Sequence, residues 1–165
     1  NTDGIFSSKY TYIDDFSPEQ QAEVVMENYD PEFGKISQKG GILVGGFNFG
    51  TGSSREQAAT ALKYKGIQLI ISGSFSQTYA RNAINNGFIV LKCPELTEYL
   101  KNMFGTEKLS VRTEIKATVD FELSKIITDY KEYSFSPLGT TAQELIVCGG
   151  LENWVKSKIH NEYSN

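Results

Sequence analysis

The sequence predicts an α/β fold in which a mostly parallel βα part is followed by antiparallel strands. Over residues 42–104, short and continuous apolar runs alternate with helical segments, a pattern typical of a parallel sheet that is buried on both faces. Over residues 109–135, apolar and polar residues alternate instead, which favours two or three antiparallel strands. With 165 residues and no internal repeat, the chain is expected to form one domain over residues 1–165.

The first elements are predicted from helix start and stop signals. Residues 1–16 have no clear hydrophobic period and are expected to be irregular. The sequence Ser-Pro-Glu at residues 17–19 is a typical helix start, and the helix should extend to about Tyr29. The Asp-Pro pair at residues 30–31 should end it, because proline disfavours a helical conformation in the residue before it.

Glycines separate the elements of the central part. A Gly-Gly pair at residues 40–41 precedes the first apolar run, and Gly66 and Gly87 each follow a helical segment, as glycine commonly does at helix C-termini. The expected elements are a strand at 42–44, a helix at 57–65, a strand at 67–71, a helix at 76–86, a strand at 88–91 and a helix at 94–104.

Two helices are expected after the alternating segment. The first should be capped by Thr140 or Thr141, which follow a Pro-Leu-Gly break, and the second should span residues 151–159. Trp154 is expected to anchor the second helix in the core. Residues 161–165 should be frayed.

The cysteine and histidine counts exclude several kinds of site. Cys93, Cys148 and the single histidine, His160, are too few for a disulfide scaffold, a zinc site or an iron–sulfur cluster held by this chain alone. Both cysteines lie in apolar stretches and are expected to be buried, and His160 to be at the surface. No apolar run approaches the ~20 residues of a membrane span. The net charge of −4 does not favour nucleic acid either, so we expect neither a membrane nor nucleic acid as a partner.

The stretch from Gly45 to Glu56 is the strongest candidate for chemistry. Four glycines between a strand and a helix allow positive φ angles and a close approach of the backbone to a ligand. The helix N-terminus and Arg55 favour an anion. Ser53 and Glu56 have the spacing of a capping box, so the spacing alone leaves both a plain helix cap and an anion site open. The stretch matches neither the Walker phosphate loop of nucleoside triphosphatases nor a dinucleotide fingerprint, so a small carboxylate is the expected ligand.

Four stretches carry a resemblance to a known family. Residues 48–58, NFGTGSSREQA, resemble the serine loop of the aconitase superfamily. Residues 1–10 resemble the opening of that family's swivelling domain, residues 74–87 resemble its Ser-Phe…Arg-Asn stretch, and residues 149–156 resemble its tail. The resemblance covers nearly the whole chain and is strongest to the fungal homoaconitase branch of the superfamily.

The resemblance implies a three-layer β/β/α swivelling domain, the last domain of a larger hydro-lyase. It also implies that a [4Fe–4S] cluster is bound by other domains of the same polypeptide, with no metal held in this chain. Ser53 would be the general base, Ser54 and Arg55 would bind a substrate carboxylate, and Lys9 would be a further substrate contact. Lys9 is also compatible with a plain surface lysine.

The resemblance assigns supporting roles to five further residues. Asp3 would orient the serine loop or its arginine, although an aspartate there could simply cap a turn. Gly50 and Gly52 would shape the loop, and Glu56 would support it. Arg81, together with the asparagine that follows it, would brace the loop rather than touch substrate.

The resemblance further implies hydration and dehydration of a tricarboxylic hydroxy acid, in which homocitrate, homoaconitate and homoisocitrate are interconverted. This reaction would belong to lysine synthesis and would take place in the mitochondrial matrix. The swivelling domain of an isopropylmalate isomerase or of an aconitase is the alternative within the superfamily. A non-catalytic module that binds RNA or another anion is the alternative of a different class.

Overall fold

The computed structural model describes the backbone of residues 1–162 and the side chains of residues 1–159. The fraying expected for residues 161–165 and the surface position expected for the His160 side chain therefore lie outside the described residues. No helix in the described part of the chain is both long and apolar enough to cross a membrane.

The N-terminal segment is more ordered than its sequence predicts. Its elements are α1 (Thr2–Ile5), a 3₁₀ turn (Ser8–Tyr10), α2 (Pro18–Val24) and α3 (Phe33–Ile36). The expectation of an irregular segment over residues 1–16 is thus wrong at α1, where the Asn1 side chain accepts a hydrogen bond from the Gly4 N–H at 2.8 Å. The Ser17 cap is confirmed, but α2 ends five residues before Tyr29 because Met26 takes a φ of 66° and turns the chain.

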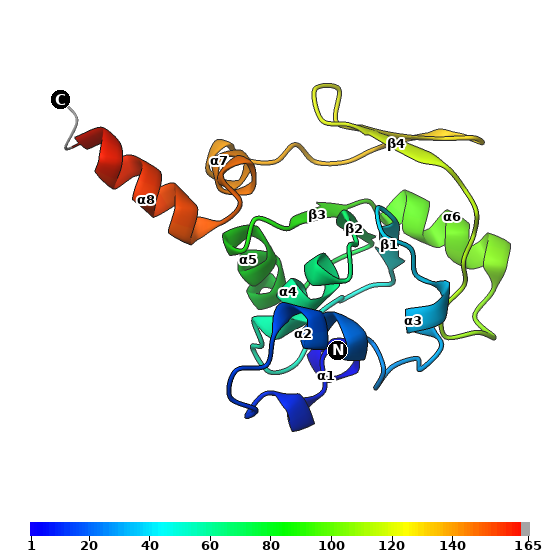
Figure 1. Ribbon diagram of the computed structural model, residues 1–165. Coiled ribbons are helices and arrows are strands. Elements are labelled where there is room, and N and C mark those ends of the chain that lie inside the picture. The colour runs from blue at the N-terminus through cyan, green and yellow to red at the C-terminus, as the bar shows by residue number, and fades with distance from the viewer. Residues whose placement is uncertain (163–165) are drawn as a thin grey trace.

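A parallel three-stranded sheet forms the centre of the molecule (Figure 1). Its strands lie in the order β1 (Ile42–Gly45), β2 (Leu69–Ser72) and β3 (Ile89–Lys92). The helices between and after them are α4 (Gln57–Tyr64), α5 (Gln77–Asn85) and α6 (Pro94–Phe104). The predicted elements of this part are confirmed to within two residues at their ends, although β1 is half-buried rather than fully buried.

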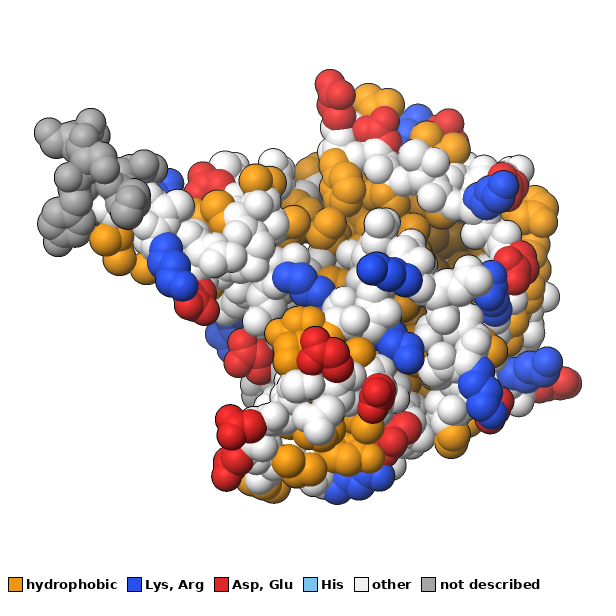
Figure 2. Space-filling model, viewed as in Figure 1, with side chains coloured by type: hydrophobic (Ala, Val, Ile, Leu, Met, Phe, Trp, Pro, Cys, Tyr) orange, Lys and Arg blue, Asp and Glu red, His pale blue; other side chains and the backbone are white. Residues whose placement is uncertain are grey.

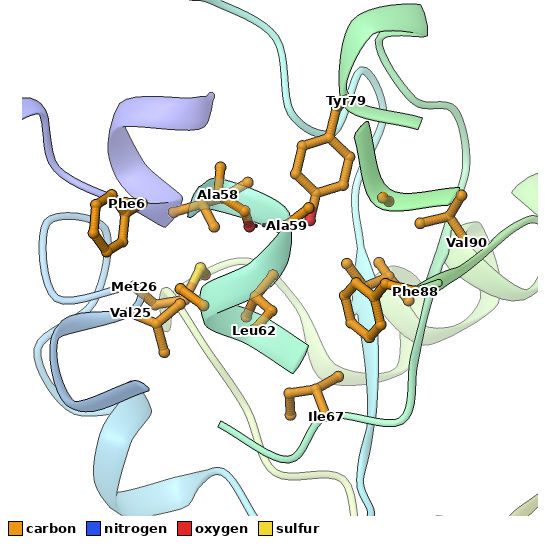
Figure 3. Packing of buried hydrophobic residues seen from close by; sticks show 14 of the residues in the cluster. Phe6, Val25, Met26, Ala58, Ala59, Leu62, Ile67, Tyr79, Phe88 and Val90 are labelled. Carbon is orange, nitrogen blue, oxygen red and sulfur yellow. Dashed lines mark hydrogen bonds between the residues drawn. The ribbon is translucent and has the colours of Figure 1, made fainter. Parts of the chain in front are cut away.

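The two faces of the parallel sheet bury different layers, because side chains alternate along a strand. Ile70 and Val90 face a cluster with α4 and α5, in which α4 lies between Phe6 and Met26 on one side and Phe88 on the other (Figure 3). Side chains of the opposite face belong to a second cluster with α6 and the antiparallel strands: Leu69, Ile71, Leu91, Leu96, Ile126 and Tyr133.

The antiparallel sheet is the third layer. It consists of β4 (Ala117–Asp120), β5 (Lys125–Thr128) and β6 (Glu132–Ser134), paired in sequence order. The predicted β/β/α arrangement is therefore confirmed. The alternation that begins near residue 109 does not form a strand before residue 117, so the first part of that prediction is wrong.

The C-terminal helices are α7 (Thr140–Cys148) and α8 (Leu151–Glu162). Neither Thr140 nor Thr141 caps α7, because Gly139 is the N-cap and makes no side-chain bond. α8 extends away from the rest of the molecule (Figure 1). The role of Trp154 as a core anchor is also wrong: its ring is only half-buried and its Nε1–H donates to Glu144 at 2.8 Å.

Candidate active site in the serine loop

The serine loop, residues 45–56, follows β1 and is fixed at its first half by the start of α5. The Phe49 N–H donates to the Ser74 carbonyl at 2.9 Å, and the Ser76 N–H donates back to the Phe49 carbonyl at the same distance. The Ser76 hydroxyl donates to the Gly50 carbonyl at 2.8 Å. These bonds tie the loop to the stretch between β2 and α5, although the two are some 26 residues apart in sequence.

The second half of the loop is fixed by α1. The Thr2 N–H donates to the Thr51 carbonyl at 2.7 Å, and the Thr2 hydroxyl donates to the Ser53 carbonyl at 2.9 Å. Thr2 itself is buried. The N-terminal segment therefore places the backbone of the candidate base, and no pattern in the sequence indicates this role for Thr2.

Glycine is required at two loop positions. Gly50 has a φ of 75°, and a Cβ there would lie 2.2 Å from Cγ of the buried Tyr79. Gly52 has a φ of 111°, and a Cβ there would meet the Thr2 hydroxyl at 3.0 Å. Both glycines thus combine a left-handed backbone with close packing, as the sequence predicts for this loop.

The capping-box alternative is wrong. α4 begins at Gln57, with Glu56 as its N-cap, and no side chain caps it. Within the described residues, Ser53 Oγ makes no hydrogen bond, and Ser53 is exposed. Its hydroxyl is therefore available to a ligand. Glu56 instead accepts a bond from the Asn86 side chain at 2.9 Å and links the loop end to the end of α5.

Backbone donors surround the two serines. In the described part of the chain, the N–H groups of residues 52–56 donate no hydrogen bond to the protein. Donors of this kind ahead of a helix favour a negative charge, because they add to the positive end of the helix dipole. The loop can therefore stabilise a carboxylate or a developing oxyanion.

Arg55 is held by the N-terminal segment. Its Nη1 donates to Oδ1 of Asp3 at 2.7 Å and to the Phe6 carbonyl at 2.9 Å, and its side chain is only 13% exposed. Hydrogen bonds from the Ser8 N–H, at 2.9 Å, and from Arg55 hold the pKa of the Asp3 carboxyl below its ordinary value. Both bonds use Nη1, so the rest of the guanidinium fork keeps its donors for a ligand.

Lys9 forms an ion pair beside this network. Its Nζ lies 2.6 Å from Oε1 of Glu27 and 4.7 Å from the centre of the Tyr10 ring. Glu27 raises the pKa of the Lys9 ammonium, and Lys9 in turn lowers the pKa of Glu27. Because the Lys9 side chain is 61% exposed, it can still meet a ligand, but only in competition with Glu27.

Ser54 and Arg81 differ in their contacts. The Ser54 hydroxyl accepts a bond from the Asn82 side chain at 3.3 Å, so the bracing expected of the Arg81–Asn82 pair is made by the asparagine. Arg81 is exposed and, among residues 1–159, makes neither an ion pair nor a hydrogen bond through its side chain. The bracing role of Arg81 itself stays a prediction.

The side chains that the structure describes, those of residues 1–159, do not fit an iron–sulfur cluster or another bound metal. Cys93 is fully buried beneath the antiparallel sheet, and burial raises the pKa of its thiol. Cys148 is half-buried on α7, so the expectation that both cysteines are buried holds for Cys93 alone. No group of three His, Cys, Asp or Glu side chains that could hold a metal occurs among the described residues.

A large cavity in the described part of the chain lies away from the serines. It has a volume of about 860 Å³ and follows the outer edge of β1 toward the end of α6 and residues 105–116. Its lining includes Phe47 and Phe49 from the start of the serine loop but none of Ser53, Ser54 and Arg55. The candidate chemistry is thus on the surface, at a loop, rather than in this cavity.

The sequence of this chain is similar to the sequences of known proteins. Residues 4–96 match the sequence profile described as the aconitase C-terminal domain. The chain is 48% identical over 164 residues to mitochondrial homoaconitase of Neurospora crassa and 52% identical over 167 residues to that of Gibberella zeae. Each alignment covers 96% of this chain but 21% and 22% of the relative, so the chain spans about a fifth of the length of these curated relatives.

A solved structure is similar over almost the whole chain. The crystal structure of 3-isopropylmalate dehydratase from Methanocaldococcus jannaschii superposes with a TM-score of 0.83 and 28% sequence identity. The superposition covers 99% of this chain and 90% of the other. Because the matched profile spans more than half of the sequence and includes the whole serine loop, the chain belongs to the aconitase C-terminal domain family.

Proposed function

We propose that this chain is the C-terminal swivelling domain of a homoaconitase, a hydro-lyase that interconverts homocitrate, homoaconitate and homoisocitrate. The identity of 48–52% to mitochondrial homoaconitases over nearly the whole chain supports this substrate class above the other acids of the superfamily. The single observation that carries the chemistry is the exposed Ser53 hydroxyl, which is not used as a helix cap and stands beside unpaired backbone donors.

In this proposal Ser53 is the general base. Its Oγ takes the proton from the substrate carbon next to a carboxylate, which requires the serine to act as an alkoxide. The N–H groups of residues 52–56 and the charge of Arg55 stabilise that oxyanion, since preorganised donors need no reorganisation as the charge develops. The Ser54 hydroxyl and the free part of the Arg55 fork bind the carboxylate.

Lys9 is the proposed contact to a second carboxylate. Substrate would compete with Glu27 for the ammonium, and Lys9 lacks the bidentate fork of an arginine. Asp3, Gly50, Gly52 and Glu56 support the loop through the contacts described above.

The remaining domains of the same polypeptide are proposed to bind the [4Fe–4S] cluster. The cluster supplies a Lewis acid for the leaving hydroxyl when it is bound. No step assigned to this chain passes through it, because the chain's own side chains do not fit it. The names of the relatives support a mitochondrial location.

The test is a comparison of substrates with the full-length enzyme that contains this chain. We expect kcat/KM for homoaconitate to exceed those for isocitrate and isopropylmalate by at least about tenfold, or about 1.4 kcal/mol. The similarity to 3-isopropylmalate dehydratase makes isopropylmalate the substrate to compare most closely. A higher kcat/KM for isopropylmalate or isocitrate would overturn the assignment of the substrate.

A further inference from the structure

The turn that follows α2 is held rigidly against the N-terminal segment. Met26 has a φ of 66°, a left-handed conformation that a residue with a side chain rarely adopts. Its N–H donates to the Ile5 carbonyl at 2.7 Å, and its carbonyl accepts from the Tyr29 and Asp30 N–H groups at 2.9 and 2.7 Å. The Met26 side chain is buried beside Phe6 (Figure 3). The surrounding contacts therefore fix the unusual conformation.

Asn28, on this turn, contacts the residue that holds Arg55. Its Nδ2 donates to the Asp3 carbonyl at 3.0 Å and to Oδ2 of Asp3 at 2.8 Å. The other carboxylate oxygen, Oδ1, accepts from Arg55 and from the Ser8 N–H. Because Asn28 holds Oδ2, the carboxylate cannot rotate freely, and Oδ1 stays directed at the guanidinium.

Glu27, the residue before Asn28, contacts the other candidate cation. Its Oε1 lies 2.6 Å from Nζ of Lys9 and accepts the Tyr10 hydroxyl at 2.8 Å. The Tyr10 ring is stacked on Phe16, with ring centres 5.3 Å apart and an interplanar angle of 10°. Two adjacent residues of one rigid turn thus reach the two cationic groups, one of them directly and the other through Asp3.

We propose that Asn28 is a positioning residue that fixes Arg55 through Asp3. This inference rests on the proposed function and deepens it. A guanidinium that is already held in one orientation binds a substrate carboxylate more tightly, because less side-chain freedom is lost on binding. The turn therefore contributes to the affinity for the hydroxy acid without touching it.

The test uses Asn28→Ala and Asn28→Asp in the full-length enzyme. Loss of the bond to Asp3 loosens the carboxylate clamp, which binds ground state and transition state alike, so Asn28→Ala should raise KM about tenfold and leave kcat within about twofold. Asn28→Asp has nearly the shape of the native residue but places a second carboxylate beside Asp3, so it should raise KM more than alanine does. Asn102→Ala, at an exposed position on α6, is the matched control and should change neither constant.

The order of the two variants separates positioning from packing. A residue that only fills space would tolerate its isostere, so Asn28→Asp performing better than Asn28→Ala would overturn the proposal, as would an unchanged KM in both. In an Asp3→Ala background, Asn28→Ala should raise KM less than about twofold further, because it acts through Asp3. A further tenfold increase in that background would contradict the coupling.

A binding measurement keeps this test separate from the proposed function. Calorimetry with 1,2,3-propanetricarboxylate should show the same weakening, about tenfold for Asn28→Ala, whichever hydroxy acid the enzyme prefers. A wild-type preference for another acid would refute the homoaconitase assignment alone. Unchanged affinity for the tricarboxylate in both Asn28 variants would refute the positioning role alone.

Discussion

The helical side and the antiparallel side of the parallel sheet differ in the size of the buried cluster that each forms, fifteen residues against eight. On the helical side, Phe6, Leu62 and Tyr79 are fully buried, and the serine loop is fixed at both ends by hydrogen bonds. On the antiparallel side, large apolar groups such as Leu123, at 63% exposure, remain in contact with solvent. Figure 2 shows hydrophobic side chains in a hollow below the antiparallel sheet.

This difference follows the proposed division of roles. The candidate base and both candidate cations belong to the N-terminal segment and the serine loop, and Arg55 is the one of the three whose side chain is largely buried. None of these side chains comes from the antiparallel sheet, from the lining of the cavity along the outer edge of β1, or from α8. We infer that the backbone of the loop that carries the candidate base is held by its hydrogen bonds to the N-terminal segment and to the start of α5.

The largest expected effects on stability come from two isoleucines, one on each side of the parallel sheet, that are both 0% exposed. Ile70→Ala on β2 should lower the free energy of unfolding by about 4 kcal/mol, and Ile126→Ala on β5 by about 2 kcal/mol, because a loosely covered site can relax around the cavity. Ile127→Ala, next to Ile126 but 36% exposed, should cost less than about 1 kcal/mol. Denaturant unfolding measures all three, and equal losses for Ile70 and Ile126 would remove the difference between the sides.

A smaller loss of stability tests the serine loop. Gly50→Ala must accommodate a Cβ against Tyr79 and a left-handed backbone, and should cost about 3 kcal/mol. Gly46→Ala, four residues earlier, meets nothing within 4 Å and should cost less than about 1 kcal/mol. Equal stability of the two variants would show that the loop is not packed as described.

Acid should affect the N-terminal segment through Asp3. Its pKa is lower in the folded protein than the ordinary value of 3.8, so its contribution to stability is complete above that value and is lost as the pH falls through the folded pKa. Asp3→Asn should therefore flatten the dependence of the unfolding free energy on pH below about 4. The effect should be small, because the carboxylate is exposed. An unchanged acid dependence would contradict the Asp3–Arg55 contact.

The smallest effect is a difference in thiol reactivity. Cys93 is buried and its pKa is raised, whereas Cys148 on α7 is half-buried. A thiol reagent should therefore modify the folded protein at Cys148 first, with Cys93 reacting only on unfolding. Mass spectrometry of the labelled protein identifies the site, and faster labelling of Cys93 would show that the antiparallel layer opens readily.

Much of the helical side could be predicted from the sequence, because its signals are local. Ser76 caps α5, and Gly87, with a φ of 65°, follows its end, so that helix was predicted to within one residue at each end. Continuous apolar runs were sufficient to predict the three parallel strands. The alternation at residues 109–116 was misleading, since those residues pass along the cavity without a strand partner.

The candidate site could be predicted only where a motif marks it. Ser53, Ser54 and Arg55 stand out in the serine loop, whereas Thr2 and Asn28 were missed. Thr2 lies 51 residues and Asn28 lies 25 residues from its partner in the chain, and such bonds leave no periodic signal. The left-handed Met26 that presents Asn28 could not be foreseen either, because no glycine marks it.

The most direct test of the central claim is the rate of the Ser53→Ala variant of the full-length enzyme. If Ser53 is the base, kcat should fall by about 10³-fold with the midpoint of thermal unfolding unchanged, because no cap is lost. Ser54→Ala is the matched control and should mainly raise KM. Retention of kcat within about twofold in Ser53→Ala would contradict the account.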